Sequence, residues 1–178
     1  MALKKIVTYP HPVLRQKTQA VTAFDEQLQE LIADLTETMY AAPGAGLAAN
    51  QIGISLRVAI IEISALAPPS AADEPREKKH LALINPEILS GEGSQLDEEG
   101  CLSVADFSAN VKRFQRIRVR AQDPTGQTTE FEAKDHFARV IQHEVDHLDG
   151  ILFIDHVSSL KRSLYKKRLK KQLKEEKN

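Results

Sequence analysis

The sequence predicts an α+β fold in which mostly antiparallel sheets surround a central helix, with a further helix at the C-terminal end. Three observations indicate this fold. Residues 25–40 and 136–148 repeat apolar side chains at helical spacing, β-branched runs lie between them, and no regular β-α-β alternation occurs. Because 178 residues with 42% hydrophobic content suffice for one core, we expect a single domain over residues 1–178.

The first predicted helix runs from Asp25 to Tyr40. Asp25 is a typical N-cap residue, because its carboxylate can accept hydrogen bonds from the first backbone N–H groups of a helix. The apolar side chains that would face the core are Leu28, Leu31, Ile32, Leu35 and Met39.

Two apolar runs after this helix predict buried strands, "SLRVAIIEIS" (55–64) and "LALINPEIL" (81–89). Between them, "SALAPPSAADEPREKKH" (64–80) is rich in Pro, Ala and charged residues, which predicts a surface loop. Further on, "RIRVRAQDPTGQTTEFEAKD" (116–135) alternates apolar and polar residues around "DPTG", a pattern typical of a hairpin.

The central helix is predicted over residues 136–148. Asp135 would be its N-cap, and Gly150 follows at the position where a left-handed backbone ends a helix. The apolar side chains of this helix are Phe137, Val140, Ile141, Val145 and Leu148.

Residues 158–178 carry nine Lys or Arg and two Glu, a net charge of +7 within a chain whose total is −1. Four leucines near helical spacing predict a basic amphipathic helix, at Leu160, Leu164, Leu169 and Leu173. Two interpretations remain open: a solvated helix docked by its leucines, or one that also contacts RNA phosphates or an acidic partner. Nothing in it indicates sequence-specific nucleic-acid recognition.

No apolar run approaches the roughly 20 residues that a membrane span needs, and the start "MALKKIVTYP" lacks the apolar stretch of a signal peptide. We therefore expect a cytoplasmic protein with no membrane partner. Its single cysteine, Cys101, cannot form an internal disulfide, so it is a packed thiol, a nucleophile or a metal ligand.

The segment "QHEVDHLDG" (142–150) sets His143 and His147 four residues apart, on one face of the predicted helix. Two imidazoles in this arrangement can bind one zinc ion, and Glu144 beside the first can reach a water on the metal without ligating it. The alternative is a pair of partly exposed histidines on an amphipathic helix.

A catalytic site of this kind commonly needs a third protein ligand. In metzincin proteases it is a later histidine, but Phe153 occupies that position here, and the only glutamates beyond the motif are Glu175 and Glu176 in the basic tail. Upstream, "EEGCLSV" presents Cys101 after Gly100. A thiolate with two imidazoles suits iron(II) or zinc, although a free cysteine can also be a small buried apolar residue.

Together, "GAGLAANQ", "EGCLS" and "QHEVDH" resemble the three signature segments of the peptide deformylases, and "YPHPVLR" is similar to the start of many members. Alone, the glycine pair of the first segment would read as a helix-to-strand turn. The resemblance covers the chain to about residue 165 and implies hydrolysis of the N-formyl group from the N-terminal formyl-methionine of newly made polypeptides, with release of formate.

The resemblance also implies roles for single residues. Cys101, His143 and His147 would bind one metal ion per chain, Fe2+ in many members and Zn2+ or another divalent metal in others. Glu144 would be the general acid and base.

Further residues would support the reaction in the family. The side-chain amide of Gln51 and the backbone N–H of Leu102 would stabilise the oxyanion, and Gly46 would hold the substrate backbone in an extended pairing. Glu99 and Gln142 would orient the metal ligands.

The chain departs from the family pattern after "EGCLS". Many members have a proline and, shortly after, an arginine that anchors substrate, whereas this chain has Ala105 and then Ser108. Ala45 is also smaller than the branched residue often found there. We therefore assign no substrate preference beyond formyl-methionine from the sequence.

Two other functions compete with the deformylase interpretation. A zinc endopeptidase would use the same histidine-glutamate helix but would cleave internal peptide bonds. A small RNA-associated protein would use the cysteine and histidines as a structural metal site. The partners expected for a deformylase are formyl-methionyl nascent peptides and, through residues 158–178, the ribosome.

Overall fold

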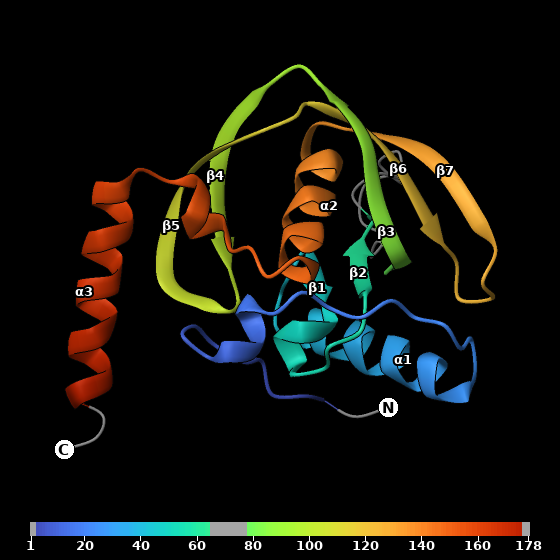
Figure 1. Cartoon of the computed structure of the whole chain (residues 1–178), viewed down its shortest axis with the longest axis horizontal. Helices are drawn as coiled ribbons and strands as arrows, with labels where there is room; N and C mark the ends of the chain where they lie inside the picture. The colour runs from blue at the N-terminus through green and yellow to red at the C-terminus, as the bar shows by residue number, and fades with distance from the viewer. Residues whose placement is uncertain (1–2, 65–77, 176–178) are drawn as a thin grey trace, which may run out of the picture.

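The computed structural model describes residues 3–64 and 78–175 (Figure 1). Part of the predicted loop over 64–80 therefore lies outside the described residues. The helices are α1 (Glu26–Ala41), α2 (Asp135–Leu148) and α3 (Ser159–Glu175), with short 3-10 turns η1 (Pro12–Arg15), η2 (Ala49–Ile52) and η4 (Phe153–His156). The strands are β1 (Gly46–Ala48), β2 (Val58–Glu62), β3 (His80–Glu92), β4 (Gln95–Cys101), β5 (Val104–Arg113), β6 (Arg116–Gln122) and β7 (Thr128–Lys134).

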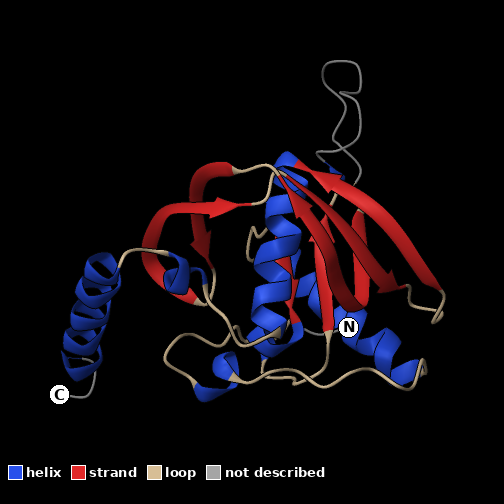
Figure 2. Ribbon diagram, turned by 45° about the horizontal axis from the view of Figure 1, so that its top comes forward, coloured by secondary structure: helices blue, strands red, loops and turns tan. Residues whose placement is uncertain are grey.

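The strands form two antiparallel sheets, which confirms the predicted α+β class. One sheet has five strands in the order β1-β2-β3-β6-β7, and the other is the pair β4-β5. Figures 1 and 2 show α2 between the two sheets, with α1 against the end of the larger one. The central helix is therefore covered on both sides. Within the described residues, no helix is long and apolar enough to cross a membrane.

Helix α1 forms as predicted. The Oδ1 atom of Asp25 accepts a hydrogen bond from the N–H of Leu28 at 3.1 Å, so the predicted cap is confirmed. All five predicted core residues of this helix are buried, and they pack in one cluster with Val58 and Ile60 of β2.

Both apolar runs and the hairpin are also strands. β2 and β3 pair within the larger sheet, and β6 and β7 pair across a turn in which Gly126 has a φ of 90°. Leu83, Ile117 and Val119 of this sheet pack with Ile141 of α2.

The pair β4-β5 is not among the predicted strands, and β1 occupies a segment that reads as a turn. The buried face of β4-β5 carries charged residues, Glu99 and Arg113, which are 6% exposed each. Glu99 is the one buried residue of β4 and is paired with Arg113, so no apolar alternation marks that strand, although β5 also buries Val104, Ala109 and Val111.

The cap predicted for α2 is wrong. Lys134 holds the N-cap position without a side-chain cap bond, and Asp135 is the first helical residue, with a φ of 51°. Its carboxylate instead accepts a hydrogen bond from Gln115, so the turn between β5 and β6 fixes it. At the other end Gly150 has the predicted left-handed backbone, with a φ of 74°.

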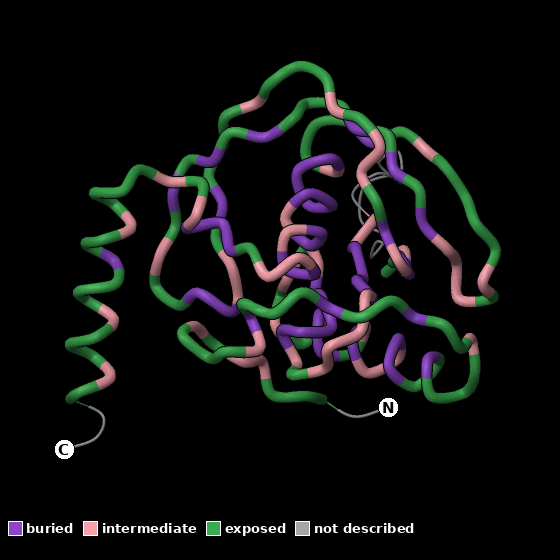
Figure 3. Tube along the Cα trace, in the orientation of Figure 1, coloured by how far each residue is buried: buried purple, intermediate pink, exposed green. Residues whose placement is uncertain are grey.

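The basic helix α3 forms, but it does not dock by the leucines at its start. Leu160 and Leu164 are 69% and 60% exposed. The anchor is Tyr165, 3% exposed, whose ring lies 4.8 Å from that of Phe107, with Leu169 packed nearby. Figure 3 shows the rest of this helix at the edge of the molecule, largely exposed.

Candidate metal centre and active site

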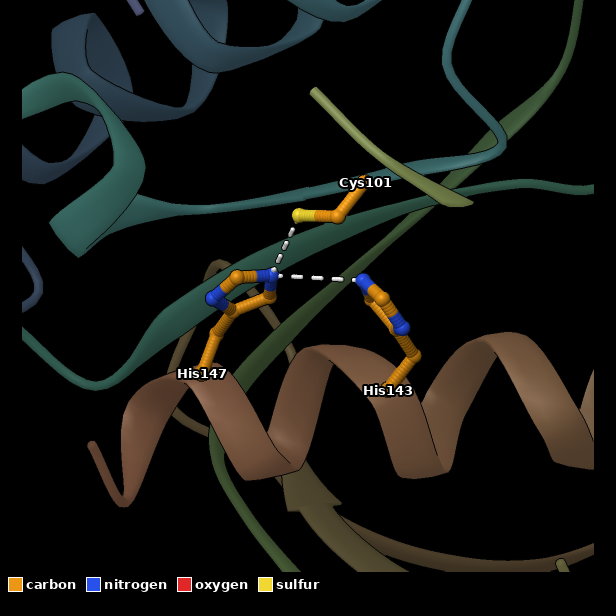
Figure 4. A group of neighbouring side chains, drawn as sticks. All are labelled: Cys101, His143 and His147. Carbon is orange, nitrogen blue, oxygen red and sulfur yellow. Dashed lines mark hydrogen bonds between the residues drawn. The ribbon is translucent and has the colours of Figure 1, made fainter. Parts of the chain in front are cut away.

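The three predicted metal ligands converge on one point (Figure 4). The Sγ atom of Cys101 lies 3.1 Å from Nε2 of His147, which in turn lies 3.2 Å from Nε2 of His143. All three donor atoms lie within 4.8 Å of one another. One ion between them could therefore contact all three.

Local structure explains this convergence. The two histidines are one turn apart on α2, so their rings share a face. Cys101 ends β4, where the pairing with β5 shifts register between Gly100 and Cys101. An irregularity of this kind turns a side chain out of its regular direction, and here it brings the sulfur toward the helix.

His143 is oriented by Glu99, since its Nδ1 lies 3.0 Å from Oε2 of that carboxylate. Glu99 also accepts hydrogen bonds from the guanidinium groups of Arg113 and Arg139. Although burial raises it, the hydrogen bonds from His143 and Arg113 hold the pKa of Glu99 well below its usual range. With a metal on Nε2, an ionised Glu99 would hold the remaining proton of His143 on Nδ1 and so fix the orientation of the ring.

Cys101 is flanked by Gln51 and Ser103. Nε2 of Gln51 lies 3.7 Å from the sulfur and donates to Oγ of Ser103 at 3.1 Å. The backbone N–H of Ser103 donates to the sulfur at 3.4 Å, and Oε1 of Gln51 accepts from the N–H of Ala48. The sulfur thus accepts hydrogen bonds from two sides, from Gln51 and from Ser103.

Glu144 lies beside the three ligands in a cavity of about 390 Å³. The residues that line this cavity include Gly44, Gly46, Gln51, Cys101, Leu102 and His143. Glu144 is 3% exposed, and its Oε2 atom has no hydrogen-bond partner within the described residues. Burial raises the pKa of Glu144 to about 7, a value suited to giving and taking protons near neutral pH.

Gln142 contacts none of the three ligands directly. Its amide bonds the backbone N–H and C=O of Phe114, and so ties α2 to the turn after β5. Ser108 donates its hydroxyl to Glu98, so this position offers no basic side chain to a substrate. His136 lines the cavity, whereas His156, at the end of η4, contacts Asp146 of α2.

Sequence reasoning missed Arg113, Arg139 and Asn50. Arg139 sits one turn before His143 on the same helix and reaches Glu99 at 2.7 Å, while Asn50 donates to the backbone C=O of His147 at 2.5 Å. The one feature of the sequence that could have indicated a role for Asn50 is its position next to Gln51 in the segment "GAGLAANQ".

The donor set fits a metal ion. A thiolate sulfur and two imidazole nitrogens are soft or borderline ligands, and three protein ligands leave a position for reactants. Burial, together with the nearby His143, lowers the pKa of His147 well below its usual value. This shift favours the neutral imidazole, which is the form that ligates a metal.

Comparisons with known proteins agree with this geometry. A family model described as polypeptide deformylase matches residues 3–163. The chain belongs to this family. A peptide deformylase of Desulfotalea psychrophila is 52% identical over 171 residues, which cover 96% of this chain and 97% of that protein. A crystal structure of a peptide deformylase from Legionella pneumophila superposes with a TM-score of 0.84 at 39% identity, covering 99% of both chains.

A second solved deformylase, from Thermus thermophilus, gives a TM-score of 0.83 at 36% identity and covers 96% of this chain and 95% of its own. The protein is thus a deformylase, an enzyme that removes N-formyl groups from nascent peptides. The endopeptidase interpretation receives no support from these comparisons.

Proposed function

We propose that this deformylase uses one divalent metal per chain, held by Cys101, His143 and His147. The observation that carries this proposal is the convergence of their donor atoms within 4.8 Å, beside a cavity that Glu144 also lines. When bound, the metal would supply Lewis-acid chemistry and make water a better nucleophile near neutral pH. The side chains around it would supply orientation, proton transfer and charge stabilisation.

Proton transfer is assigned to Glu144. A formamide resists hydrolysis because amide resonance must be broken and the amine is a poor leaving group. The carboxylate of Glu144 would take a proton from the attacking water and return it to the nitrogen of the departing amine. The products are formate and a free N-terminal amine.

Gln51 and Leu102 would stabilise the negative charge that develops on the formyl oxygen. The donors are Nε2 of Gln51 and the backbone N–H of Leu102, both in segments that line the cavity. Gly46 would hold the substrate backbone. It lies in β1, an edge strand of the larger sheet, and a free edge can pair with an extended peptide.

Two measurements test these assignments together. Formate release from a formyl-methionyl peptide should be fast, with no cleavage of internal peptide bonds. Metal analysis of anaerobically purified protein should give one ion per chain, and Cys101→Ala should lose it. A Cys101→Ala protein that holds stoichiometric metal tightly would overturn the ligand set.

Iron(II) is our proposal for the native metal. Sulfur and imidazole ligands suit iron(II) and zinc better than magnesium or calcium. Iron(II) beside a thiolate is open to oxidation of both metal and sulfur, so activity should decline in air and persist without oxygen. Full activity after hours in air would exclude iron, whereas zinc-loaded protein serves as the air-stable control.

We further propose that this one catalytic domain acts in the cytoplasm and meets nascent chains at the ribosome through the basic helix of residues 158–178. Lys166, Lys167 and Lys170 are exposed on α3 and would attract RNA phosphates. This interaction would raise the concentration of enzyme where its substrates emerge.

Charge reversal tests the ribosome contact better than truncation, because Tyr165 of α3 packs against Phe107 and its removal would expose a buried cluster. Changing Lys166, Lys167 and Lys170 to Glu should weaken ribosome binding and reduce its salt dependence, while activity on a short peptide stays unchanged. The matched control changes the same residues to Arg. Equal ribosome binding by both variants would contradict the proposal.

A further inference from the structure

Two of the three proposed ligands have a side-chain partner that fixes them, and the third does not. Glu99 accepts from His143, and Gln51 contacts the sulfur of Cys101. His147 is 1% exposed, and its Nδ1 atom has no hydrogen-bond partner within the described residues. Because its Nε2 atom faces the other two ligands, a neutral ligating ring must carry its proton on Nδ1. The result is a buried N–H without an acceptor.

An unused acceptor belongs to a residue that His147 already contacts. Asn50 is fully buried, and its Nδ2 atom donates to the backbone C=O of His147 at 2.5 Å. That bond assigns the nitrogen of the amide, so the other atom is the oxygen. Oδ1 of Asn50 also lacks a partner within the described residues. A donor and an acceptor are thus both unsatisfied on two residues joined by a hydrogen bond.

A polar group that is buried without a hydrogen-bond partner is destabilising, so the donor and the acceptor would both be stabilised by joining. A side-chain rotation could join the two atoms directly, or one buried water could bridge them, since waters commonly satisfy buried polar groups in this way. Either arrangement keeps the His147 proton on Nδ1.

We propose that Asn50 is the positioning residue of His147, its Oδ1 accepting the Nδ1–H directly or through one buried water. This inference rests on the proposed metal site. Consecutive residues of η2 would then support two ligands from two segments, Asn50 for His147 and Gln51 for Cys101. The turn η2 would thus position two of the three ligands, and Glu99 would position the third.

The test compares metal affinity in matched variants. Both variants lose the Nδ2 donor to the C=O of His147, but Asn50→Leu keeps the volume and also removes the acceptor, whereas Asn50→Asp keeps an acceptor at the same place. We expect Asn50→Leu to bind Zn2+ about 10–100-fold more weakly in competition with a chelator, the usual effect of losing a ligand's hydrogen-bond partner. Asn50→Asp should restore affinity to within a few-fold of wild type. Equal affinity for Asn50→Leu and wild type would overturn the proposal.

Thr18→Val is the control for packing at the same end of α2. Thr18 is 6% exposed and donates to the backbone C=O of Leu148, the neighbour of His147, at 2.9 Å. Its loss should lower thermal stability without changing Zn2+ affinity. A loss of affinity in Thr18→Val equal to that in Asn50→Leu would show a general packing effect and would overturn the specific role of Asn50.

One readout needs no variant. In Zn2+-loaded wild-type protein labelled with 15N-histidine, His147 should show a protonated Nδ1 whose hydrogen exchanges slowly. A rapidly exchanging hydrogen, or protonation at Nε2, would overturn the proposal even if Asn50→Leu fails to fold. Wild-type protein that binds no Zn2+ would instead refute the metal site itself, so the two failures are distinguishable.

Discussion

Gly46 leaves the space that the carboxylate of Glu144 occupies. A Cβ atom built on Gly46 would lie 2.7 Å from Oε1 and 2.8 Å from Cγ of Glu144, closer than real side chains approach. The edge strand β1 and the central helix α2 thus meet at the proposed general base. A glycine is required here by the position of Glu144, in addition to any contact that its backbone makes with substrate.

Gly46→Ala should therefore displace Glu144 and lower kcat on the order of 100-fold, within the range that general acid–base catalysis contributes. Metal content should not change, because none of the three proposed ligands is touched. Gly44→Ala is the matched comparison. Its Cβ would meet the flexible end of Leu102 at 3.0 Å and the backbone oxygen of Gly46 at 3.3 Å, both longer than the contacts at Gly46, so we expect a smaller loss. Steady-state kinetics check both, and equal rates for Gly46→Ala and wild type would contradict the steric argument.

Glu144→Gln should keep the metal and nearly abolish turnover. The amide has the size of the carboxylate but cannot take a proton from water, so the expected loss in kcat is about 10²–10⁴-fold. Because Oε2 of Glu144 is buried without a hydrogen-bond partner, a charge there is costly. We therefore expect the Glu144→Gln protein, with its neutral side chain, to be at least as stable as wild type. Metal analysis, thermal unfolding and formate release together separate these effects. A variant with wild-type turnover would remove Glu144 from the mechanism.

Gln51→Glu isolates the donor function of this amide. The variant keeps an oxygen that can accept from the N–H of Ala48 and loses the Nε2 donor. Loss of one oxyanion donor typically costs about 10²–10³-fold in rate, and we expect that loss in kcat. Gln51→Ala should lose the same activity and some stability as well, because Ala48 and Ser103 both lose a partner. Unchanged kcat in both variants would exclude Gln51 as an oxyanion donor.

The sequence predicts a helix or strand well when the residues on the buried face of that element are apolar. Helix α1 and the β6-β7 hairpin have apolar faces and local start or turn signals, so their patterns suffice. β5 buries Ala109 and Val111 at alternate positions, but the one buried residue of β4 is the charged Glu99, paired with Arg113, so no apolar alternation reveals that strand. The start of α2 was misassigned because the carboxylate of Asp135 bonds Gln115, a residue 20 positions away.

The site divides in the same way. Short motifs contain the three ligands, Glu144 and Gln51, because their chemistry depends on local spacing or on a signature segment. The residues that support them come from distant positions: Arg139 is 40 residues from Glu99, and Asn50 is 97 residues from His147. Such partners are defined only by the fold, which brings η2 and the end of the β4-β5 pair together beside α2.

The ion pair between Arg15 and Asp155 predicts a pH-dependent part of the stability. Two guanidinium nitrogens contact the two carboxylate oxygens at 2.5 and 3.1 Å, and the backbone N–H of Leu152 donates to the same carboxylate. Although burial raises it, these hydrogen bonds lower the pKa of Asp155 below its usual value of 3.8. The pair joins the N-terminal turn η1 to η4, just beyond the metal helix.

The pKa of Asp155 is lower in the folded protein than in the unfolded chain. At pH values between these two pKa values the unfolded state binds more protons, so the free energy of unfolding rises with pH. The contribution should be complete above about pH 4–5 and should be lost as pH falls through the folded pKa. Since both side chains are about 30% exposed, we expect Asp155→Asn to lower the free energy of unfolding by about 1 kcal/mol at pH 7. Urea unfolding of wild type and Asp155→Asn from pH 7 to pH 3 measures this, with Arg15→Met and the double variant completing a cycle. The difference should shrink below pH 4, and a constant difference over the whole range would show that the charge of Asp155 does not stabilise the fold.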